Sequence, residues 1–165
     1  MLEECQNRIR AMSLVHESLY QSDDLAAVNF GEYARNLGNH LLSTYLLAPG
    51  TVRLHVVSED IRLDIDRAIP CGLILNELIA NALKHAFPNG REGEIRLTLE
   101  KRDDGKLLVS VADNGVGIPE GTNIPSTRSL GLRLIHSLTR QLDAHFELVR
   151  LEPGTDARLT LDVAP

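Results

Sequence analysis

The order of hydrophobic periodicities along this chain of 165 residues excludes most folds. Helical spacing of apolar residues predicts helices at 2–20, 31–47, 70–86 and 130–142. Alternation predicts strands at 52–57, 61–65, 94–100, 107–112, 145–151 and 157–163. Because turn signals such as Asp103-Asp104-Gly105 join consecutive strands as hairpins, a doubly wound parallel sheet is disfavoured. The pattern favours an α+β fold: a two-layer α/β sandwich whose mixed, mostly antiparallel sheet carries helices on one face, preceded by an N-terminal helix.

Charge and cysteine content limit the function classes. Seventeen Lys and Arg against 23 Asp and Glu give a net charge of −6, which argues against a protein that mainly grips nucleic acid or an anionic membrane. Cys5 and Cys71 are too few for a disulfide framework or a thiolate zinc site. There is no apolar run long enough to span a membrane and no basic leader at the N-terminus, so we expect a cytoplasmic protein.

The predicted helix at 70–86 carries the first candidate site. Its apolar residues cover one arc, and a second arc of about 100° carries four polar residues, Glu77, Asn81, Lys84 and His85. A carboxylate and an amide one turn apart are oxygen ligands suited to Mg²⁺, and the lysine ammonium can bind phosphate as a point charge. A solvated helix face without further role is the alternative.

Three further segments contain glycine next to polar residues. In Asp113-Asn114-Gly115-Val116-Gly117-Ile118 the glycines permit close backbone approach to a flat ligand, and the aspartate can accept a hydrogen bond from an exocyclic amine such as that of adenine. Ser129-Leu130-Gly131-Leu132 opens a helix whose free N–H groups can bind phosphate. Gly154-Thr155 precedes the last predicted strand. Taken singly, each is equally a simple turn or a capped helix start.

The N-terminal helix has apolar residues at alternating steps of three and four, which form a seam of Leu2, Cys5, Ile9, Met12, His16 and Leu19. The seam lasts less than three heptads, so the helix needs a partner. Two alternatives stay open: packing on its own domain, or pairing as a dimerisation or hairpin helix with a helix outside this chain.

Taken in order, these segments resemble the N box and glycine boxes of the Bergerat-fold ATPases. Asn76-Glu77-Leu78 through Lys84-His85-Ala86-Phe87 is similar to the N box of one group of sensor histidine kinases, and residues 7–20 resemble their second dimerisation helix. Their phosphoacceptor histidine lies on the preceding helix, which this chain does not include. The resemblance implies a remnant dimerisation helix at 1–25 and an ATP-binding catalytic domain at 26–165. Asp143-Ala144 departs from the family, which commonly has a glycine pair there.

The resemblance also implies roles for individual residues. Glu77 and Asn81 would be catalytic and hold Mg²⁺, and Glu77 is further hypothesised to act as a base toward the acceptor imidazole. The implied ATP-binding residues are Asn81, Lys84, His85, Asp113, Gly115, Gly117, Ile118, Leu130, Gly131, Leu132 and Thr155. Lys84 would contact phosphate and Asp113 the adenine amine, with Thr155 helping through water. Residues 114–128 would form the lid, with Gly131 at its hinge.

The implied activity is transfer of the γ-phosphoryl of Mg·ATP to a histidine outside this chain. The expected partners are a phosphoacceptor dimerisation domain and the receiver domain of a response regulator, within a homodimeric full-length kinase, with no nucleic acid or membrane contact. A clamp-type ATPase in which Glu77 activates water, and a nucleotide-free interaction module, are the alternatives. His16, followed by Glu17, is interpreted as a seam residue, with a phosphoacceptor role left open.

Overall fold

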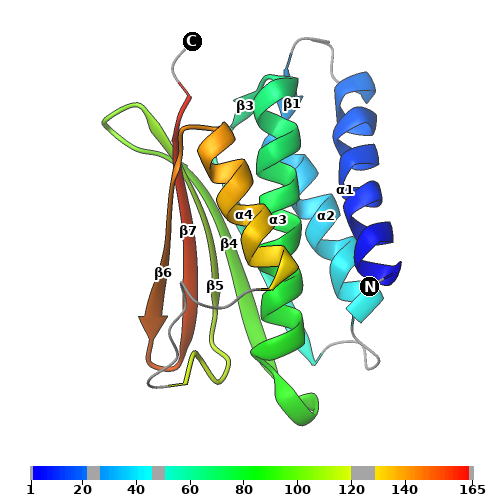
Figure 1. Cartoon of the computed structure of the whole chain (residues 1–165), viewed down its shortest axis with the longest axis vertical. Coiled ribbons are helices and arrows are strands. Elements are labelled where there is room, and N and C mark those ends of the chain that lie inside the picture. Colours follow the sequence, from blue (N-terminus) through cyan, green and yellow to red (C-terminus); the bar gives the residue numbers. More distant parts are fainter. Residues whose placement is uncertain (1, 22–26, 46–50, 120–128, 164–165) are drawn as a thin grey trace.

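The computed structural model describes residues 2–21, 27–45, 51–119 and 129–163, and it confirms the expected α+β class (Figure 1). The helices are α1 (Leu2–Gln21), α2 (Phe30–Tyr45), α3 (Ile65–His85) and α4 (Leu130–Gln141), with a short 3-10 turn at Pro88–Gly90. The strands are β1 (Val28–Asn29), β2 (Val52–Ser58), β3 (Arg62–Leu63), β4 (Gly93–Lys101), β5 (Lys106–Asp113), β6 (His145–Leu151) and β7 (Gly154–Asp162).

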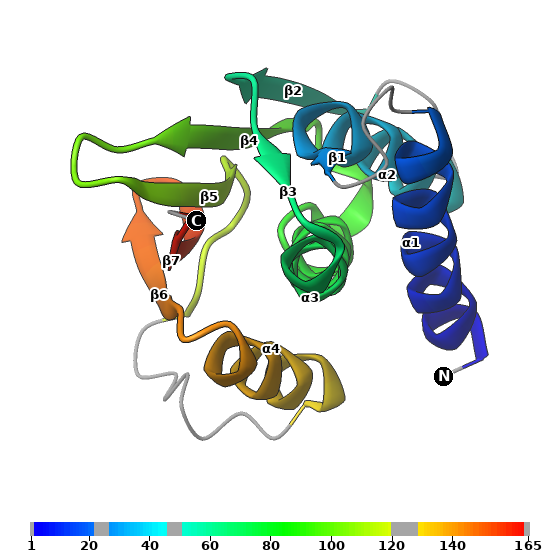
Figure 2. The ribbon, with the colours of Figure 1, turned by 90° about the horizontal axis from the view of Figure 1, so that it is seen from above.

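The main sheet is mixed and mostly antiparallel, as expected. Its strand order is β2-β4-β5-β7-β6; β2 and β4 are parallel, and the other neighbours are antiparallel. The short β1 and β3 form a separate ribbon. Figure 2 shows α2, α3 and α4 on one face of the sheet, with α1 on the far side of α2 and α3. The architecture is therefore a two-layer sandwich with one additional helix outside it.

Helix α3 lies at the centre of the molecule because its apolar arc packs against the sheet. Ile74, Leu75 and Ile79 are fully buried, as are Ile95 and Leu97 of β4. Burying each such side chain stabilises the fold by about 1.5–3 kcal/mol. This packing fixes the rotation of α3, so the polar arc of the helix is directed away from the sheet.

The predicted start of α3 is wrong by five residues. Asp64 caps the helix by accepting a hydrogen bond from the Arg67 amide at 2.9 Å, and helical residues begin at Ile65. Pro70 therefore lies in the second turn instead of the first. The ring removes the hydrogen bond to the Asp66 carbonyl, and Pro70 is buried, so its ring also contributes to packing.

Several other element ends differ from expectation. The strand predicted at 61–65 is reduced to β3, because Ile65 already belongs to α3. Strand β7 begins at Gly154, three residues before the prediction. After α4, Asp143 adopts a left-handed φ of 49°. This is the backbone conformation that glycine favours, and it accounts for the glycine pair that the resemblance led us to expect there.

Helix α1 packs on its own domain mainly through a face other than the predicted seam, of which Leu19 packs against the core. Ala11, Leu14 and Val15 are buried in the common core. The seam residues Ile9 and Met12 are exposed, Ile9 by 62%. The face read as a seam is thus still available to a partner. No helix among the described residues is both long and apolar enough to cross a membrane.

Candidate functional site

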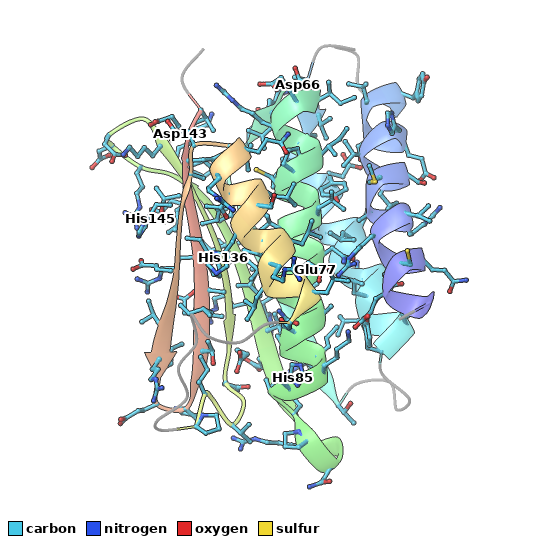
Figure 3. The ribbon with its side chains drawn as sticks, in the orientation of Figure 1. Asp66, Glu77, His85, His136, Asp143 and His145 are labelled. Atoms are coloured by element: carbon cyan, nitrogen blue, oxygen red, sulfur yellow. The ribbon has the colours of Figure 1, made fainter. Side chains whose placement is uncertain are left out.

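Glu77 is the best-anchored residue of the predicted site. Its side chain projects from the middle of α3 (Figure 3) and is only 7% exposed. Arg8 of α1 donates from Nε to Oε1 at 2.8 Å and from Nη2 to Oε2 at 3.0 Å. Asn76 Nδ2 donates to Oε1 at 3.1 Å. Charge-assisted, two-pronged contacts of this kind are strong and geometrically specific, so the carboxylate is held in one orientation.

The first turn of α4 lies directly beside this carboxylate. A Cβ at Gly131 would stand 2.6 Å from Glu77 Oε2, so only glycine fits without displacing it. Ser129 caps α4, accepting from the Leu132 amide at 3.2 Å. Leu130 is exposed and Leu132 is half-buried. The structure thus brings the N box next to the glycine segment Ser129-Leu130-Gly131-Leu132.

Lys84 is engaged with α1 in this structure. Its Nζ lies 2.7 Å from Glu4 Oε1 and 5.3 Å from the centre of the Tyr45 ring. Burial is the largest single effect and opposes the charged form of the ammonium, but the hydrogen bond to Glu4 and the interactions with the Glu4 and Tyr45 groups together outweigh it and raise the pKa of Lys84. Lys84, which is predicted to bind phosphate, is therefore charged. Its side chain is directed at α1, on the same side of α3 as Glu77.

Asn81 and His85 occupy the remaining polar arc of α3. Asn81 is half-buried one turn after Glu77, and His85 is exposed at the C-terminal end of the helix. In Figure 3, Glu77 and His85 mark the middle and the end of the same helix. The side chains of the predicted set thus extend over two turns, a length that a polyphosphate can span.

Asp113 ends β5 as a buried carboxylate, 8% exposed. It accepts from the Gly115 amide at 2.9 Å, and it stands opposite Thr155 across the β5–β7 ladder. Burial raises the pKa of Asp113, while hydrogen bonds from the Gly115 and Thr155 amides work against that shift. Two residues 42 positions apart in the sequence are therefore adjacent, as the predicted adenine site requires.

The glycines after Asp113 allow three backbone segments to meet. A Cβ at Gly115 would overlap the Ala86 carbonyl at the end of α3, where Val116 donates to that oxygen at 2.9 Å. Gly117 has a φ of 70°, and its Cβ would stand 3.1 Å from the Gly154 oxygen. Side chains at these positions would push the loop away from α3 and β7.

Two open cavities formed by the described residues are lined by neither Glu77 nor Asp113. One, of about 490 Å³, is at the start of α2 and the end of β2. The other, of about 410 Å³, lies between Val116–Ile118 and the β6–β7 turn, so Ile118 lines it together with Gly117. Most of the predicted lid, residues 120–128, falls outside the described residues.

Three residues at this site were missed by sequence reasoning. Asn76 is 2% exposed, and its Oδ1 has no hydrogen-bond partner. A buried unpaired oxygen costs about 1–3 kcal/mol, so a buried asparagine is rarely retained for stability alone. An asparagine among the apolar residues of a helix is therefore the sequence feature that indicates a functional role here. Arg8 and Glu4 gave no such signal, because their partners lie 69 and 80 positions away.

Gly154→Ala should lower the free energy of unfolding by about 2–4 kcal/mol. Gly154 has a φ of 111°, and a Cβ there would overlap the Asp113 carbonyl oxygen. Chemical denaturation measures the loss. Gly105→Ala is the control, because Gly105 has a similar φ of 81° but open space around it, so only the backbone cost of about 1 kcal/mol remains. Equal losses in both variants would show that the overlap is relieved at no cost.

Comparisons with known proteins agree with this geometry. A family described as histidine kinase-, DNA gyrase B- and HSP90-like ATPases matches residues 66–165. A family described as histidine kinases matches residues 1–45.

Curated relatives carry related names. The blue-light-activated histidine kinase 2 of Erythrobacter litoralis is 26% identical over 165 residues, covering 95% of this chain and 46% of that protein. The sensor histidine kinase PdtaS of Mycobacterium tuberculosis is 32% identical, covering 98% of this chain and 32% of that protein. The chain thus spans about a third of the length of one of these relatives and just under half of the other.

Solved structures share the fold. The histidine kinase domain of the Erythrobacter litoralis blue-light-activated kinase superposes with a TM-score of 0.85 at 24% identity, covering 97% of this chain and 75% of that one. The catalytic domain of the histidine kinase ThkA gives 0.65 at 20% identity, covering 84% and 97%. At sequence identities of 24% and 20%, these superpositions show a shared fold and nothing about activity.

Proposed function

This chain belongs to the family of histidine kinase-, DNA gyrase B- and HSP90-like ATPases, and from that premise we propose that it is the ATP-binding catalytic part of a sensor histidine kinase. It would transfer the γ-phosphoryl of Mg·ATP to a histidine on a helix outside this chain. The observation that carries the proposal is the convergence of Asp113, Thr155 and Gly115 at one end of α3. The match of residues 1–45 to histidine kinases favours this activity over a clamp-type ATPase.

In the proposed complex, the end of β5 holds the nucleobase. The Asp113 carboxylate accepts a hydrogen bond from the adenine amine, and Thr155 assists through water. Gly115 and Gly117 let the backbone approach the ring, and Ile118 contributes an apolar contact. Burial of Asp113 supports this assignment, because a buried carboxylate discriminates strongly between a ligand that donates a hydrogen bond to it and one that does not.

The middle of α3 and the start of α4 hold the phosphates. Glu77 and Asn81 supply the carboxylate and amide oxygens that Mg²⁺ prefers, and the position of Gly131 against Glu77 fits a narrow cradle there. Bound Mg²⁺ would neutralise the phosphate charge that develops during transfer. The free N–H groups of the first turn of α4 and the charge of Lys84 would contribute attraction that the net negative chain lacks elsewhere. His85 would lie at the edge of the same site.

The partners of the full-length protein are part of the proposal, because the chain covers only a fraction of its relatives. Residues 1–25 would be the dimerisation remnant and 26–165 the catalytic domain. The exposed Ile9 and Met12 support a partner helix on α1, which would carry the phosphoacceptor and build the homodimer. His16 is exposed on that side as well. A response regulator receiver domain would take the phosphoryl group, in the cytoplasm where ATP is available.

The proposal is tested in two steps. Isothermal titration calorimetry with a non-hydrolysable ATP analogue should show Mg²⁺-dependent binding to the chain. Incubation with γ-labelled ATP and a separately supplied histidine kinase dimerisation domain should then label that domain on histidine. Hydrolysis of ATP without any acceptor would favour the clamp-type ATPase instead, and absence of nucleotide binding would leave an interaction module.

A further inference from the structure

The contact between α1 and α3 places two ion pairs on the predicted catalytic residues. Glu4 and Arg8 are one turn apart on α1, and their partners on α3 are Lys84 and Glu77. The acidic residue of α1, Glu4, pairs with the basic residue of α3, Lys84. The basic residue of α1, Arg8, pairs with the acidic residue of α3, Glu77. We call Glu4 and Arg8 the α1 clasp. No pattern in either helix alone requires these pairs, and both of the α3 partners belong to the proposed nucleotide site.

We propose that the α1 clasp is an autoinhibitory contact that competes with Mg·ATP for Glu77 and Lys84. The proposal rests on the proposed function, because it concerns regulation of the same site. Binding of nucleotide then requires the N-terminal turns of α1 to release α3. Any movement of α1 that breaks the two pairs raises the apparent affinity of the site.

Competition at Glu77 follows from the geometry of the pair. The Arg8 fork takes both carboxylate oxygens, at 2.8 and 3.0 Å. A Mg²⁺ ion needs at least one of those oxygens, and a guanidinium at this distance repels a dication. Gly131 closes another side of the carboxylate, so the ion and the guanidinium cannot occupy the two sides together. The cation must displace Arg8, or Arg8 excludes the cation.

Competition at Lys84 has the same form. Its ammonium is held between Glu4 Oε1 and the Tyr45 ring. The hydrogen bond from Lys84 also lowers the pKa of Glu4, so both partners stay charged. To reach a phosphate the ammonium must leave Glu4, whereas a phosphate approaching the intact pair meets the repulsion of the Glu4 carboxylate.

The rest of α1 can stay docked while the clasp opens. Among the side chains that the structure describes, those of the N-terminal turns contact the domain through polar groups: besides the two ion pairs, Asn7 donates to the Tyr45 hydroxyl at 3.0 Å. The later turns are held by the buried apolar residues Ala11, Leu14 and Val15. Polar contacts exchange for water at little net cost, whereas apolar contacts do not. Opening therefore leaves the fold intact.

Arg8→Gln should tighten binding of a Mg·ATP analogue, measured by calorimetry on the whole chain. A clasp that is closed about nine-tenths of the time lowers the apparent affinity about tenfold, and its loss restores that factor. Glu4→Gln should act in the same direction through Lys84, and it keeps the size of a side chain that is 41% exposed. Arg10→Gln is the matched control: it removes the same charge from α1, but Arg10 pairs with Glu17 of its own helix, so the affinity should not change.

Two results overturn the clasp. If wild type binds and both Arg8→Gln and Glu4→Gln bind equally or more weakly, the two residues position the site or merely stabilise the fold. If neither the wild type nor any variant binds nucleotide, the proposed function itself fails, and the clasp with it. The first result leaves the proposed function standing, so the two failures are distinguishable.

A second readout follows movement of α1 directly. Cys5 is exposed next to Glu4 on α1, whereas burial raises the pKa of the Cys71 thiol to about 12 and keeps it unreactive. A thiol-reactive fluorophore therefore labels Cys5 selectively in the native chain. A Mg·ATP analogue should change the emission of the fluorophore on Cys5 in the wild-type chain. The Arg8→Gln variant should already show part of that change without ligand. An emission indifferent to saturating ligand contradicts release of α1.

Discussion

Asp113→Asn is expected to weaken binding of Mg·ATP by at least about 100-fold. The carboxylate is buried at the end of β5 and accepts from the Gly115 amide. An asparagine retains the shape but can place an NH₂ group against the adenine amine, so that two donors face each other. A site built to pair a buried polar group discriminates by about 10⁴–10⁵ when the pairing fails. Calorimetry with an ATP analogue measures the loss.

Asp156→Asn is the control, because Asp156 is also a buried carboxylate of the same strand pair. It accepts from Ser110 at 2.6 Å and from Arg158 at 2.6 Å, so its loss should reduce stability and leave affinity nearly unchanged. Unchanged affinity in Asp113→Asn would place the adenine pocket elsewhere. Low pH should imitate the variant: burial raises the pKa of Asp113, so wild-type affinity should fall with decreasing pH before an ordinary aspartate protonates.

Glu77→Gln is expected to reduce phosphoryl transfer to a supplied acceptor domain by about 10²–10⁴-fold, the usual range for loss of a general base. In the proposed reaction an imidazole nitrogen attacks the γ-phosphorus, the bond to the bridging oxygen of ADP breaks, and Glu77 takes the proton that the imidazole loses. Glutamine keeps the size of the side chain and can neither take that proton nor hold Mg²⁺ as strongly. Labelling of the acceptor from γ-labelled ATP measures the effect.

The variant should still bind nucleotide, because the adenine contacts at Asp113 are untouched. Glu147→Gln serves as the control, since Glu147 pairs loosely with Arg158 at 3.9 Å, remote from α3. Full phosphoryl transfer by Glu77→Gln would exclude the role as a base. Normal transfer combined with normal Mg²⁺ dependence would remove Glu77 from the catalytic residues altogether.

Much of the fold could be read from the sequence because its causes are local. The strands β4 and β5 and the turn between them follow from alternation and from Gly105, whose φ of 81° a turn requires. The start of α3 could not be placed equally well. Pro70 is a common first-turn residue, whereas the structure begins the helix after Asp64, whose side chain and carbonyl accept from the Arg67 and Ala68 amides.

Some residues of the candidate site could likewise be predicted from the sequence, and others could not. Asp113, Gly115 and Gly117 could be proposed from a strand followed by spaced glycines, and Glu77 and Asn81 from one polar arc of a helix. That Gly154 must be glycine because it meets the Asp113 carbonyl was not visible, since a glycine before a strand is adequately explained as a turn. The unpaired Oδ1 of Asn76 also acquires meaning only once its burial is known.

The order of the elements, the donors and acceptors available on α3 and β5, and the resemblance to a family could all be inferred from the amino-acid sequence. These features depend on the spacing of apolar residues and on the chemistry of individual side chains, and both are properties of the amino-acid sequence alone. That Glu77 and Lys84 face Arg8 and Glu4 of α1 depends on how the helices pack together, and it could not be inferred from the sequence. Seventeen basic and 23 acidic residues allow very many ion pairs. Which of them form depends on how packing rotates each helix about its axis, and that rotation is set by the whole core.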